Sequence, residues 1–586
     1  MTDIGLLLAP KITLGGSPLK PQDALVSIRI ERGLGVIGRA TLRFDDAGFT
    51  LSTDPRFKLG AQLEITVDDK ATFEGQISGV SLEQRPGEST DFVVVADDVA
   101  RKLAHSVKPA TYLNMQYSDV ISKLCRDAGF SAQTSGSRLN GVNPYQLRTG
   151  TGLQYLDQVT RRTGTVWWVE GKTLHVDDAG TSTGTEQLTL GTDLTEFSVR
   201  ASGLRPIGAR VTGWNVHDQQ AIVGTSPARP VNQTSALVSD YAGQGPHIIG
   251  GGDVSTAEWF PVSLDEADVL AEALRDEARA AAVVARGRCW ANPAIKPSVT
   301  VKIQDAGPAS GSYLVSEVEH LYNRHGFYTR FVAGPFRPAG LVDTLGRAPS
   351  DSGFAINGLV VGQVTDNNDP DSQGRVMIKY VALDGEPGST WARVVTIGGG
   401  AQRGVVMQPE IGDEVLVGFE YGDTRRPVVI GGLFSPKNDL PEAKKIVAGG
   451  KVDYRRITSR KNHVIEIADG DQSADQHILL KLGTAAHSVL LGAEKFEVEV
   501  ASGKPVTIKA GSAKFEISAS GDVTIEGNNV TIKAQQKLQL EGVSAQLKGT
   551  AQTQVQGATV AVKADGLGSV EASGPLTLKG AIVKIN

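Results

Sequence analysis

The feature that most limits how this chain can fold is a repeat in its last eighty or so residues. Apolar residues recur, usually as pairs, and successive pairs are mostly seven to nine positions apart, often with Gly or Asn between them. The repeat positions are Val506/Ile508, Phe515/Ile517, Val523/Ile525, Val530/Ile532, Leu538/Leu540, Leu547, Val555, Val560/Val562, Leu576/Leu578 and Ile582/Ile585. A short period of this kind predicts a β-solenoid or β-helix.

A single copy of this ribbon cannot cover its own apolar side, and its backbone edges stay unpaired. A single-chain parallel β-helix usually needs longer coils of several strands each. A repeat this short favours chains that wind around a shared axis, and three copies form the smallest closed prism. We therefore expect the repeat, from about residue 504 onward, to form an intertwined triple-stranded β-helix in a homotrimer, with Lys, Glu, Gln and Thr outside.

Composition agrees with a mainly β protein. Of the 586 residues 40% are apolar, only 6% are aromatic, and 68 are glycine, which favours turn-rich β structure. The net charge of −6 and the lack of a Lys/Arg run predict no nucleic-acid partner.

Nothing in the sequence predicts export by a leader or insertion in a membrane. The N-terminus lacks a basic segment followed by a long apolar run. No apolar stretch approaches the roughly 18 residues of a membrane helix. The two cysteines, Cys125 and Cys289, suit a reducing compartment, so we expect synthesis and assembly in the cytoplasm.

The rest of the chain divides by pattern. Residues 1–100 alternate with period two and predict a first small β-barrel. Residues 101–184 mix two helices, at 118–129 with Ser118 as N-cap and at 153–164, with a hairpin at 165–178.

Residues 185–345 return to strands and predict a second barrel. They also contain a long helix expected at 263–287, with Ser263 and Glu266 as a capping box. Residues 337–352 and 435–445 are predicted to be connectors, and they flank a compact block of short strands at 353–435.

The compact block carries the most specific motifs. It contains GLVVGQVTDNNDPDSQGRVMIKY (358–380), TWARVVTIGGG (390–400) and QPEIGDEVLVGFEYGDTRRPVVIGGLF (408–434). These stretches resemble the OB-fold of VgrG proteins of type VI secretion and of hub-spike proteins in phage tails and extracellular injection particles. The matched positions are Asp366, Asn367, Asp369, Pro370, Gly374, Arg375, Trp391, Gly412, Asp413, Gly422, Asp423, Arg426 and Pro427. Many are turn residues, and we expect Arg375, Arg393 and Arg425 to pair with carboxylates or carbonyls around the barrel.

The resemblance extends more weakly upstream, to 143–176, to the helix expected at 263–287 and to 311–322. It implies a two-barrel hub at 1–345, the OB-fold at 353–435 and a needle at 446–586. It further implies a homotrimeric spike of a contractile injection system that sits on an inner tube protein and baseplate proteins. Lys584, Ile585 and Asn586 would then meet a PAAR-type tip protein, and the spike could carry effector cargo out of the cell on firing.

The motifs that could indicate catalysis, phosphate binding or metal binding are less specific than the motifs of the compact block. Ser182 lies in a Gly-x-Ser-x-Gly spelling, but a strand rather than a helix is predicted after it. GGGAQRG (398–404) lacks the Gly-Lys-Ser/Thr ending of a phosphate loop, and His320 and His325 have no third ligand nearby in sequence. We expect no catalytic residue, cofactor or metal. The alternatives left open are an elongated β-helical enzyme acting on cell wall or polysaccharide, and a fibre adhesin.

Overall fold

The structure is a computed structural model. It describes residues 9–19, 24–84, 89–105, 109–201, 208–216, 218–227, 234–237, 254–256, 261–279, 283–334, 356, 358–381, 388–441 and 446–585. The chain separates into two compact units, Met1–Leu440 and Pro441–Asn586. The connector expected at 337–352 lies outside the described residues, as does part of the one expected at 435–445.

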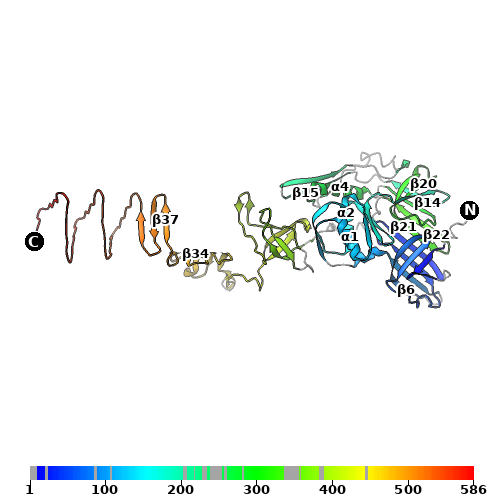
Figure 1. The fold of residues 1–586 in the computed structure, drawn as a ribbon, viewed down its shortest axis with the longest axis horizontal. Coiled ribbons are helices and arrows are strands. Elements are labelled where there is room, and N and C mark those ends of the chain that lie inside the picture. The colour runs from blue at the N-terminus through cyan, green and yellow to red at the C-terminus, as the bar shows by residue number, and fades with distance from the viewer. Residues whose placement is uncertain are drawn as a thin grey trace. The chain divides into compact units, whose positions relative to one another are not determined.

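The first unit is built on one continuous sheet of 14 strands (Figure 1). Eleven strands follow one another in the order β14 (Leu194–Ala201), β19 (Val283–Trp290), β22 (Gly326–Ala333), β21 (Gly311–Asn323), β3 (Leu25–Gly33), β4 (Arg39–Asp45), β7 (Asp91–Asp97), β6 (Lys70–Glu83), β5 (Gln62–Val67), β1 (Lys11–Leu14) and β2 (Ser17–Pro18). Three more strands pair beside this path: β13 (Gly184–Thr189), β17 (Thr234–Ser235) and β20 (Val299–Gln304). The prediction of a mainly β chain is confirmed.

Two apolar cores lie along this sheet. Alternate residues of the N-terminal strands, among them Ile30, Leu42 and Val94, form one core. Residues such as Val301 and Tyr313 form the other. The two barrel-like regions predicted from the sequence thus correspond to two cores, but strand β3 pairs antiparallel with β21 and joins them into a single sheet.

A row of charged side chains crosses the same sheet. Each residue of the row lies directly opposite the next one on the neighbouring strand. In order across the sheet they are Glu196, Arg288, Arg330, Glu319, Glu31, Arg39 and Asp97. Arg330 pairs with Glu319 at 3.2 Å, and Arg39 pairs with Asp97 at 2.8 Å. Because each charge has a partner of opposite sign close by, the row adds little net charge to the sheet.

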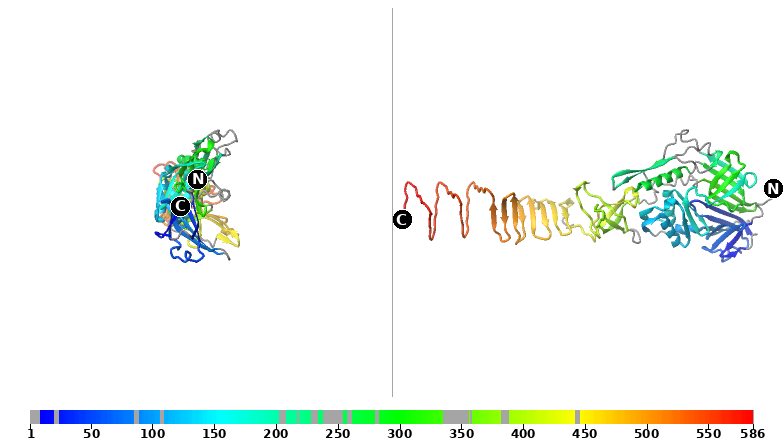
Figure 2. Two further views of the ribbon diagram at one scale, coloured as in Figure 1. Left: turned by 90° about the vertical axis from the view of Figure 1, so that its right-hand side faces the viewer. Right: turned by 45° about the horizontal axis from the view of Figure 1, so that its top comes forward.

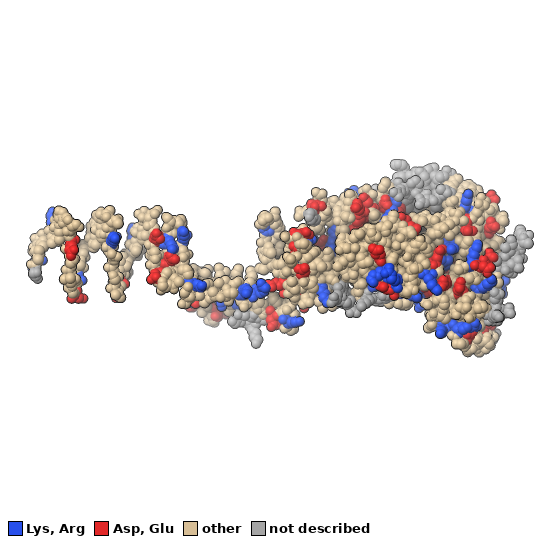
Figure 3. Space-filling view, viewed as in Figure 1, with Lys and Arg blue, Asp and Glu red and all other residues tan. Residues whose placement is uncertain are grey.

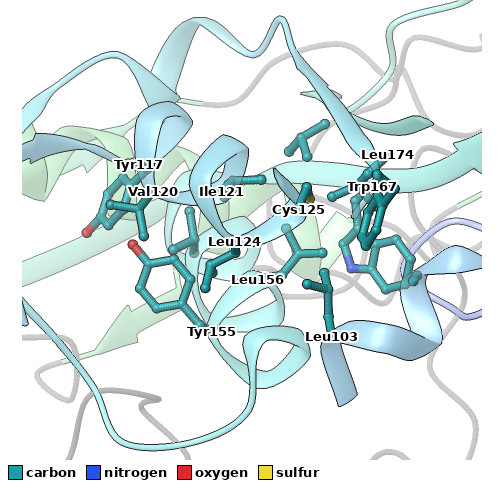
Figure 4. Close-up of a cluster of buried hydrophobic side chains, with 14 of the residues drawn as sticks. Leu103, Tyr117, Val120, Ile121, Leu124, Cys125, Tyr155, Leu156, Trp167 and Leu174 are labelled. Carbon is teal, nitrogen blue, oxygen red and sulfur yellow. The ribbon is translucent and has the colours of Figure 1, made fainter. Parts of the chain in front are cut away.

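Residues 99–178 form a helical segment with its own core. They comprise η3 (Val99–Ala104), β8 (Ala110–Gln116), α1 (Tyr117–Asp127), β9 (Ser131–Thr134), η4 (Ser137–Leu139), β10 (Val142–Arg148), α2 (Gly152–Thr163), β11 (Thr165–Glu170) and β12 (Thr173–Asp178). Figure 4 shows that α1 and α2 direct Ile121, Cys125 and Leu156 toward Trp167. The hairpin predicted at 165–178 is confirmed by the pairing of β11 with β12.

The first helix differs from its prediction at its start. Helix α1 begins at Tyr117, directly after β8, so the N-cap position falls on Gln116 and has no side-chain cap bond. Ser118 lies inside the helix and donates to Gln116 Oε1 at 3.2 Å. The second helix, α2, has the full capping box of Thr151 with Gln154 and ends at Gly164, whose φ is +64°.

The long helix is shorter than predicted. Helix α4 spans Leu264–Arg279, and from Val283 the chain is strand β19. The β-branched pair Val283–Val284 begins a strand that pairs on both edges, with β14 and β22, so residues 283–287 of the predicted helix are strand. Helix α4 packs on a small sheet of β16 (Gln220–Ser226), β15 (Ala209–Asn215) and β18 (Val254–Thr256). No described helix combines the length and apolar character that a membrane crossing requires.

The block after residue 355 forms a five-stranded sheet. Its order is β24 (Met377–Tyr380), β23 (Val360–Asp366), β28 (Glu414–Phe419), β29 (Pro427–Gly432) and β25 (Arg393–Val394). A separate hairpin of β26 (Gly399–Gly400) and β27 (Arg403–Gly404) interrupts it, and η7 (Glu420–Gly422) forms a turn. Buried Val364, Ile378 and Val417 fill the middle of the block.

The second unit begins with antiparallel strands. After the short pair β30 (Val447–Ala448) and β31 (Lys451–Val452) comes a five-stranded sheet of β32 (Tyr454–Thr458), β33 (Val464–Asp469), β34 (Gln476–Leu482), β35 (His487–Gly492) and β36 (Phe496–Glu499), with η8 (Ser473–Asp475) between strands. A three-stranded sheet of β37 (Val506–Ala510), β38 (Ala513–Ile517) and β39 (Val523–Glu526) follows. From 527 to 585 the described backbone winds on in open coils without an assigned strand (Figure 2).

Candidate functional site

The first matched motif folds into a turn organised by one carboxylate. Asp369 accepts hydrogen bonds from the backbone N–H groups of Asp371 (3.1 Å), Gln373 (2.9 Å) and Arg375 (3.2 Å). The guanidinium of Arg375 grips the same carboxylate with Nε at 3.0 Å and Nη2 at 2.6 Å, and it lies 5.9 Å from the ring centre of Trp391. The hydrogen bonds from Arg375 lower the pKa of Asp369 well below its ordinary value, against the opposing effect of burial.

The other matched residues of the block are placed at turns and strand ends. Three of them make local hydrogen bonds: Asp366 accepts from Asn368 N, Asn367 Nδ2 donates to the Pro409 carbonyl, and Asp413 accepts from Glu410 N. Gly374 and Gly412 have positive φ, of +71° and +97°. Pro370 lies in the Asp369 turn, and Pro427 is the first residue of β29. Most of these residues therefore shape backbone turns rather than an open site.

The second motif joins this block to helix α4. Asp423 and Arg425 follow a turn at Tyr421 and Gly422, where φ is +56° and +78°. Arg425 holds Asp423 through Nη2 at 2.7 Å and reaches Glu266 through Nη1 at 2.7 Å. Arg162 of α2 donates to the same Glu266 oxygen at 2.6 Å.

Glu266 is the centre of this buried cluster. Its side chain is 18% exposed, and those of Arg162 and Asp423 are each 9% exposed. Burial raises the pKa of Glu266, but the guanidiniums of Arg425 and Arg162 and the N–H of Val262 outweigh burial and hold the pKa at about 2. The carboxylate is therefore ionised and shared between two arginines at neutral pH.

Two further contacts connect the block with the rest of the first unit. Arg426 Nη2 donates to the carbonyls of Trp214 and Pro261, both at 2.9 Å. Tyr145 and Leu147 of β10 are buried in the core of the block, together with Val364 and its neighbours. Strand β10 thus supplies side chains that complete the interior of the block.

The candidate chemical motifs do not form a reaction centre. The Oγ of Ser182 donates to the carbonyl of Gly184 on the surface, where strand β13 begins. GGGAQRG forms the tight hairpin of β26 and β27 rather than a loop before a helix. His320 is buried against Phe327, with its Nδ1 3.0 Å from Thr329 Oγ1, whereas His325 lies at the surface. Within the described ranges, no group of three or more His, Cys, Asp or Glu is placed to hold a metal ion.

The second unit presents apolar side chains without cover from its own chain. One face of the sheet β32–β36 exposes Ile457, Ile465, Ile467, Ile478, Leu480, Leu482, Val489, Leu491, Phe496 and Val498. From 527 onward the exposed side chains include most of the repeat positions, and Figure 3 shows few charged groups there on the face in view. Lys584 and Ile585 are also exposed, and Asn586 lies outside the described residues.

Comparison with known proteins places these features in one class. The model of the type VI secretion system/phage-baseplate injector OB domain matches residues 360–434. The spike protein VgrG5 of the type VI secretion system of Pseudomonas aeruginosa is 29% identical over 154 residues, which is 23% of this chain and 20% of the relative. The actin cross-linking toxin VgrG1 of Vibrio cholerae is 31% identical over 118 residues, which is 19% of this chain and 10% of the relative.

Among solved structures, the half-lidded Francisella PdpA-VgrG complex matches with a TM-score of 0.52 at 9% identity, over 84% of this chain and 88% of the matched chain, which shows a shared fold. A mainly β hub followed by an injector OB domain defines a VgrG-type spike protein of type VI secretion systems and phage tails. The model of the Alg8 N-terminal domain matches residues 5–323, more than half of the chain, and the chain belongs to this family. The alignments with the two curated relatives span only a tenth to a fifth of those proteins.

Sequence reasoning singled out Asp369, Arg375 and Arg425 but missed the partners of Arg425 in the hub. As expected, Arg375, Arg393 and Arg425 all pair with carboxylates. Arg162 carried a usable signal, because it follows buried Val159 by three residues and therefore lies on the buried face of α2. A charge on such a face indicates a buried ion pair.

Proposed function

We propose that the chain works as a homotrimeric puncturing spike of a contractile injection system. In chain order, the hub at 1–345 seats the trimer on the inner tube and baseplate, the OB domain at 353–435 follows, and the needle at 446–586 transmits axial force to a target envelope. The injector OB domain and the VgrG relatives support the spike role. The proposal includes the trimer, its tube, baseplate and tip partners, and the cargo. It also includes assembly in the cytoplasm and release on firing.

One observation supports the trimer above all. Most repeat positions of the second unit are apolar and exposed in the single chain: Leu540 is 81% exposed and Val562 95%. The extended backbone from 527 to 585 also lacks an assigned strand pairing within the described chain. Apolar side chains and unpaired extended backbone are both costly in water. Other copies of the same repeat supply a cover for the side chains and a partner for the backbone.

The contacts of the OB domain fit a load-bearing role. A spike driven axially must not detach its OB domain from its hub. The Arg425–Glu266–Arg162 cluster, the two carbonyl contacts of Arg426 and the insertion of Tyr145 into the OB core all resist such detachment. We propose that force passes through these contacts and that no residue of the chain is catalytic. The toxin relative aligns over a tenth of its length, so its named activity does not transfer to this chain.

Light scattering on the purified full chain tests the assembly state. A trimer has three times the 61.8 kDa mass of one chain, and electron microscopy of contractile particles then locates it at the tip of the tube. A stable, monomeric chain with an ordered second unit would overturn the proposal. Turnover of cell-wall or polysaccharide substrate that one acidic substitution abolishes would favour the enzyme alternative instead.

A further inference from the structure

Strand β21 runs from one core of the 14-stranded sheet to the other, and His320 lies between the two. Val318 belongs to the core of the later strands, and Tyr322 packs against the core of the N-terminal strands. His320 is midway between them on the same face, because side chains two positions apart in a strand share a face. The pairing of residues 317–323 of β21 with residues 27–33 of β3, called here the barrel seam, joins the two barrel-like regions.

The imidazole of His320 is enclosed and has a single polar contact on its two nitrogens. The residue is 0% exposed, and the ring of Phe327 stacks on it with 5.9 Å between the ring centres. Nδ1 lies 3.0 Å from Thr329 Oγ1, whereas Nε2 makes no hydrogen bond within the described residues. Because an imidazolium carries a proton on both nitrogens, a charged ring in this place would bury an unpaired N–H donor together with a full charge.

A cation on the β3 side of the barrel seam opposes a second positive charge. The guanidinium of Arg32 donates to the carbonyls of Thr72 (3.3 Å) and Val169 (2.7 Å), and no carboxylate of the described residues lies within ion-pair distance of it. Burial and the charge of Arg32 lower the pKa of His320 to about 3, and only the backbone of Ile295 acts in the other direction. A proton on His320 would therefore set two positive charges against each other across the seam.

The other titratable groups around this site do not compensate a charge on the imidazole. Cys289 of β19 lies in the same cross-strand row, and burial raises the pKa of its thiol to about 12, so the thiol stays neutral. Lys296 and Glu170 form an ion pair with each other at 3.1 Å, and both line the same small cavity as Arg32 and Asp98. Burial raises the pKa of Asp98 to about 6. A raised carboxyl pKa stabilises the fold as the pH falls, so Asp98 acts with the opposite sign to the imidazole.

We propose that His320 is a pH sensor of the hub: uptake of a proton by its ring weakens the barrel seam and lets the two barrel-like regions separate. The ring holds a proton readily only where water reaches it, so acid favours the open seam. The ordinary pKa of the ring is 6.5, and in the closed seam it is about 3, so the stability of the seam is complete above about pH 6.5 and is lost as the pH falls toward 3. At pH 5 the ratio of open to closed seam should be about 30-fold higher than at pH 7.5. The inference concerns contacts within one chain and does not rest on the proposed function.

Hydrogen-exchange mass spectrometry of the full chain at pH 7.5 and pH 5 tests the seam, with the intrinsic effect of pH on exchange divided out. The variant His320→Asn keeps a polar group near Thr329 but cannot take up a proton. Between the two pH values, wild type should lose about 30-fold more protection at residues 27–33 and 317–323 than this variant, a comparison in which Asp98 cancels. The matched control is His325→Asn, at an exposed histidine in the turn between β21 and β22, and it should behave as wild type.

Equal pH dependence of wild type and His320→Asn would overturn the inference. His320→Phe, which keeps an aromatic ring beside Phe327, replaces the first variant if that variant does not fold. If neither variant folds, the wild type decides alone: protection must fall more in the barrel seam than in the β5–β6 pair of the same sheet, and an equal fall in both overturns the inference. Because the readout is local exchange and not the assembly state, either result leaves the proposed trimer untouched.

Discussion

Arg425 and Glu266 are 159 residues apart in the chain, and Arg425 Nη1 lies 2.7 Å from Glu266 Oε1. Arg425 belongs to a turn of the OB domain, and Glu266 to the first turn of helix α4 in the hub. Arg162 binds the same oxygen from helix α2. One carboxylate thus holds together three segments of the first unit.

Glu266→Gln should loosen this junction. The substitution keeps the size of the side chain but leaves two largely buried guanidiniums without a full negative charge, at a cost of about 2–3 kcal/mol. That cost corresponds to amide exchange roughly 30- to 150-fold faster around residues 423–426 and the start of α4. Hydrogen-exchange mass spectrometry measures it. The matched control is Asp265→Asn, at an exposed acidic residue of the same helix turn, which should change exchange there less than threefold. An equal effect of both substitutions would contradict the role of Glu266.

The junction should also weaken in acid. The ordinary pKa of this carboxyl is 4.5, and the folded value is about 2. Because the folded pKa is the lower one, the stabilisation is complete above about pH 4.5 and is lost as the pH falls toward 2. The difference corresponds to about 3 kcal/mol. Unfolding of the wild type and of Glu266→Gln, measured between pH 7 and pH 2, should give curves that converge in acid. Parallel curves would show that another group controls the acid transition.

Asp369→Asn should destabilise the first OB turn. The amide nitrogen of Asn cannot accept the hydrogen bonds that one carboxylate oxygen of Asp369 receives, and the pairing with Arg375 loses its charge. Because the Asp369 side chain is only 3% exposed, the expected loss is about 2 kcal/mol. Thermal melting of the protein and amide exchange of residues 369–375 report it. Asp371→Asn is the control, since Asp371 also contacts Arg375 but is 61% exposed, and its effect should stay below about 1 kcal/mol.

Sequence patterns predicted those features well that are determined by residues close together in the chain. The helix predicted at 153–164, the hairpin at 165–178 and the turn chemistry around Asp369 all depend on residues within a few positions of each other. The sequence could not show that β3 pairs with β21, because that pairing joins residues about 290 positions apart. The helix predicted to run through 283–287 is strand there for a similar reason, since β19 is held by two distant strands. The ion pair of Arg425 with Glu266 escaped prediction because neither residue's neighbours identify the other.

Leu540→Asp gives the sharpest test of the needle. In a single copy this side chain is 81% exposed, so a chain that acts alone should tolerate a carboxylate there with a change below about 0.5 kcal/mol. In a closed trimer the substitution would bring three carboxylates toward one apolar axis, where burial of an unpaired charge is very costly. We therefore expect loss of the trimer in light scattering, or at least tenfold faster proteolysis of residues after 500. Gln539→Asp adds the same charge on the opposite side of the strand pattern and should leave the trimer intact. If both variants stay trimeric and equally resistant to protease, Leu540 does not face a shared core.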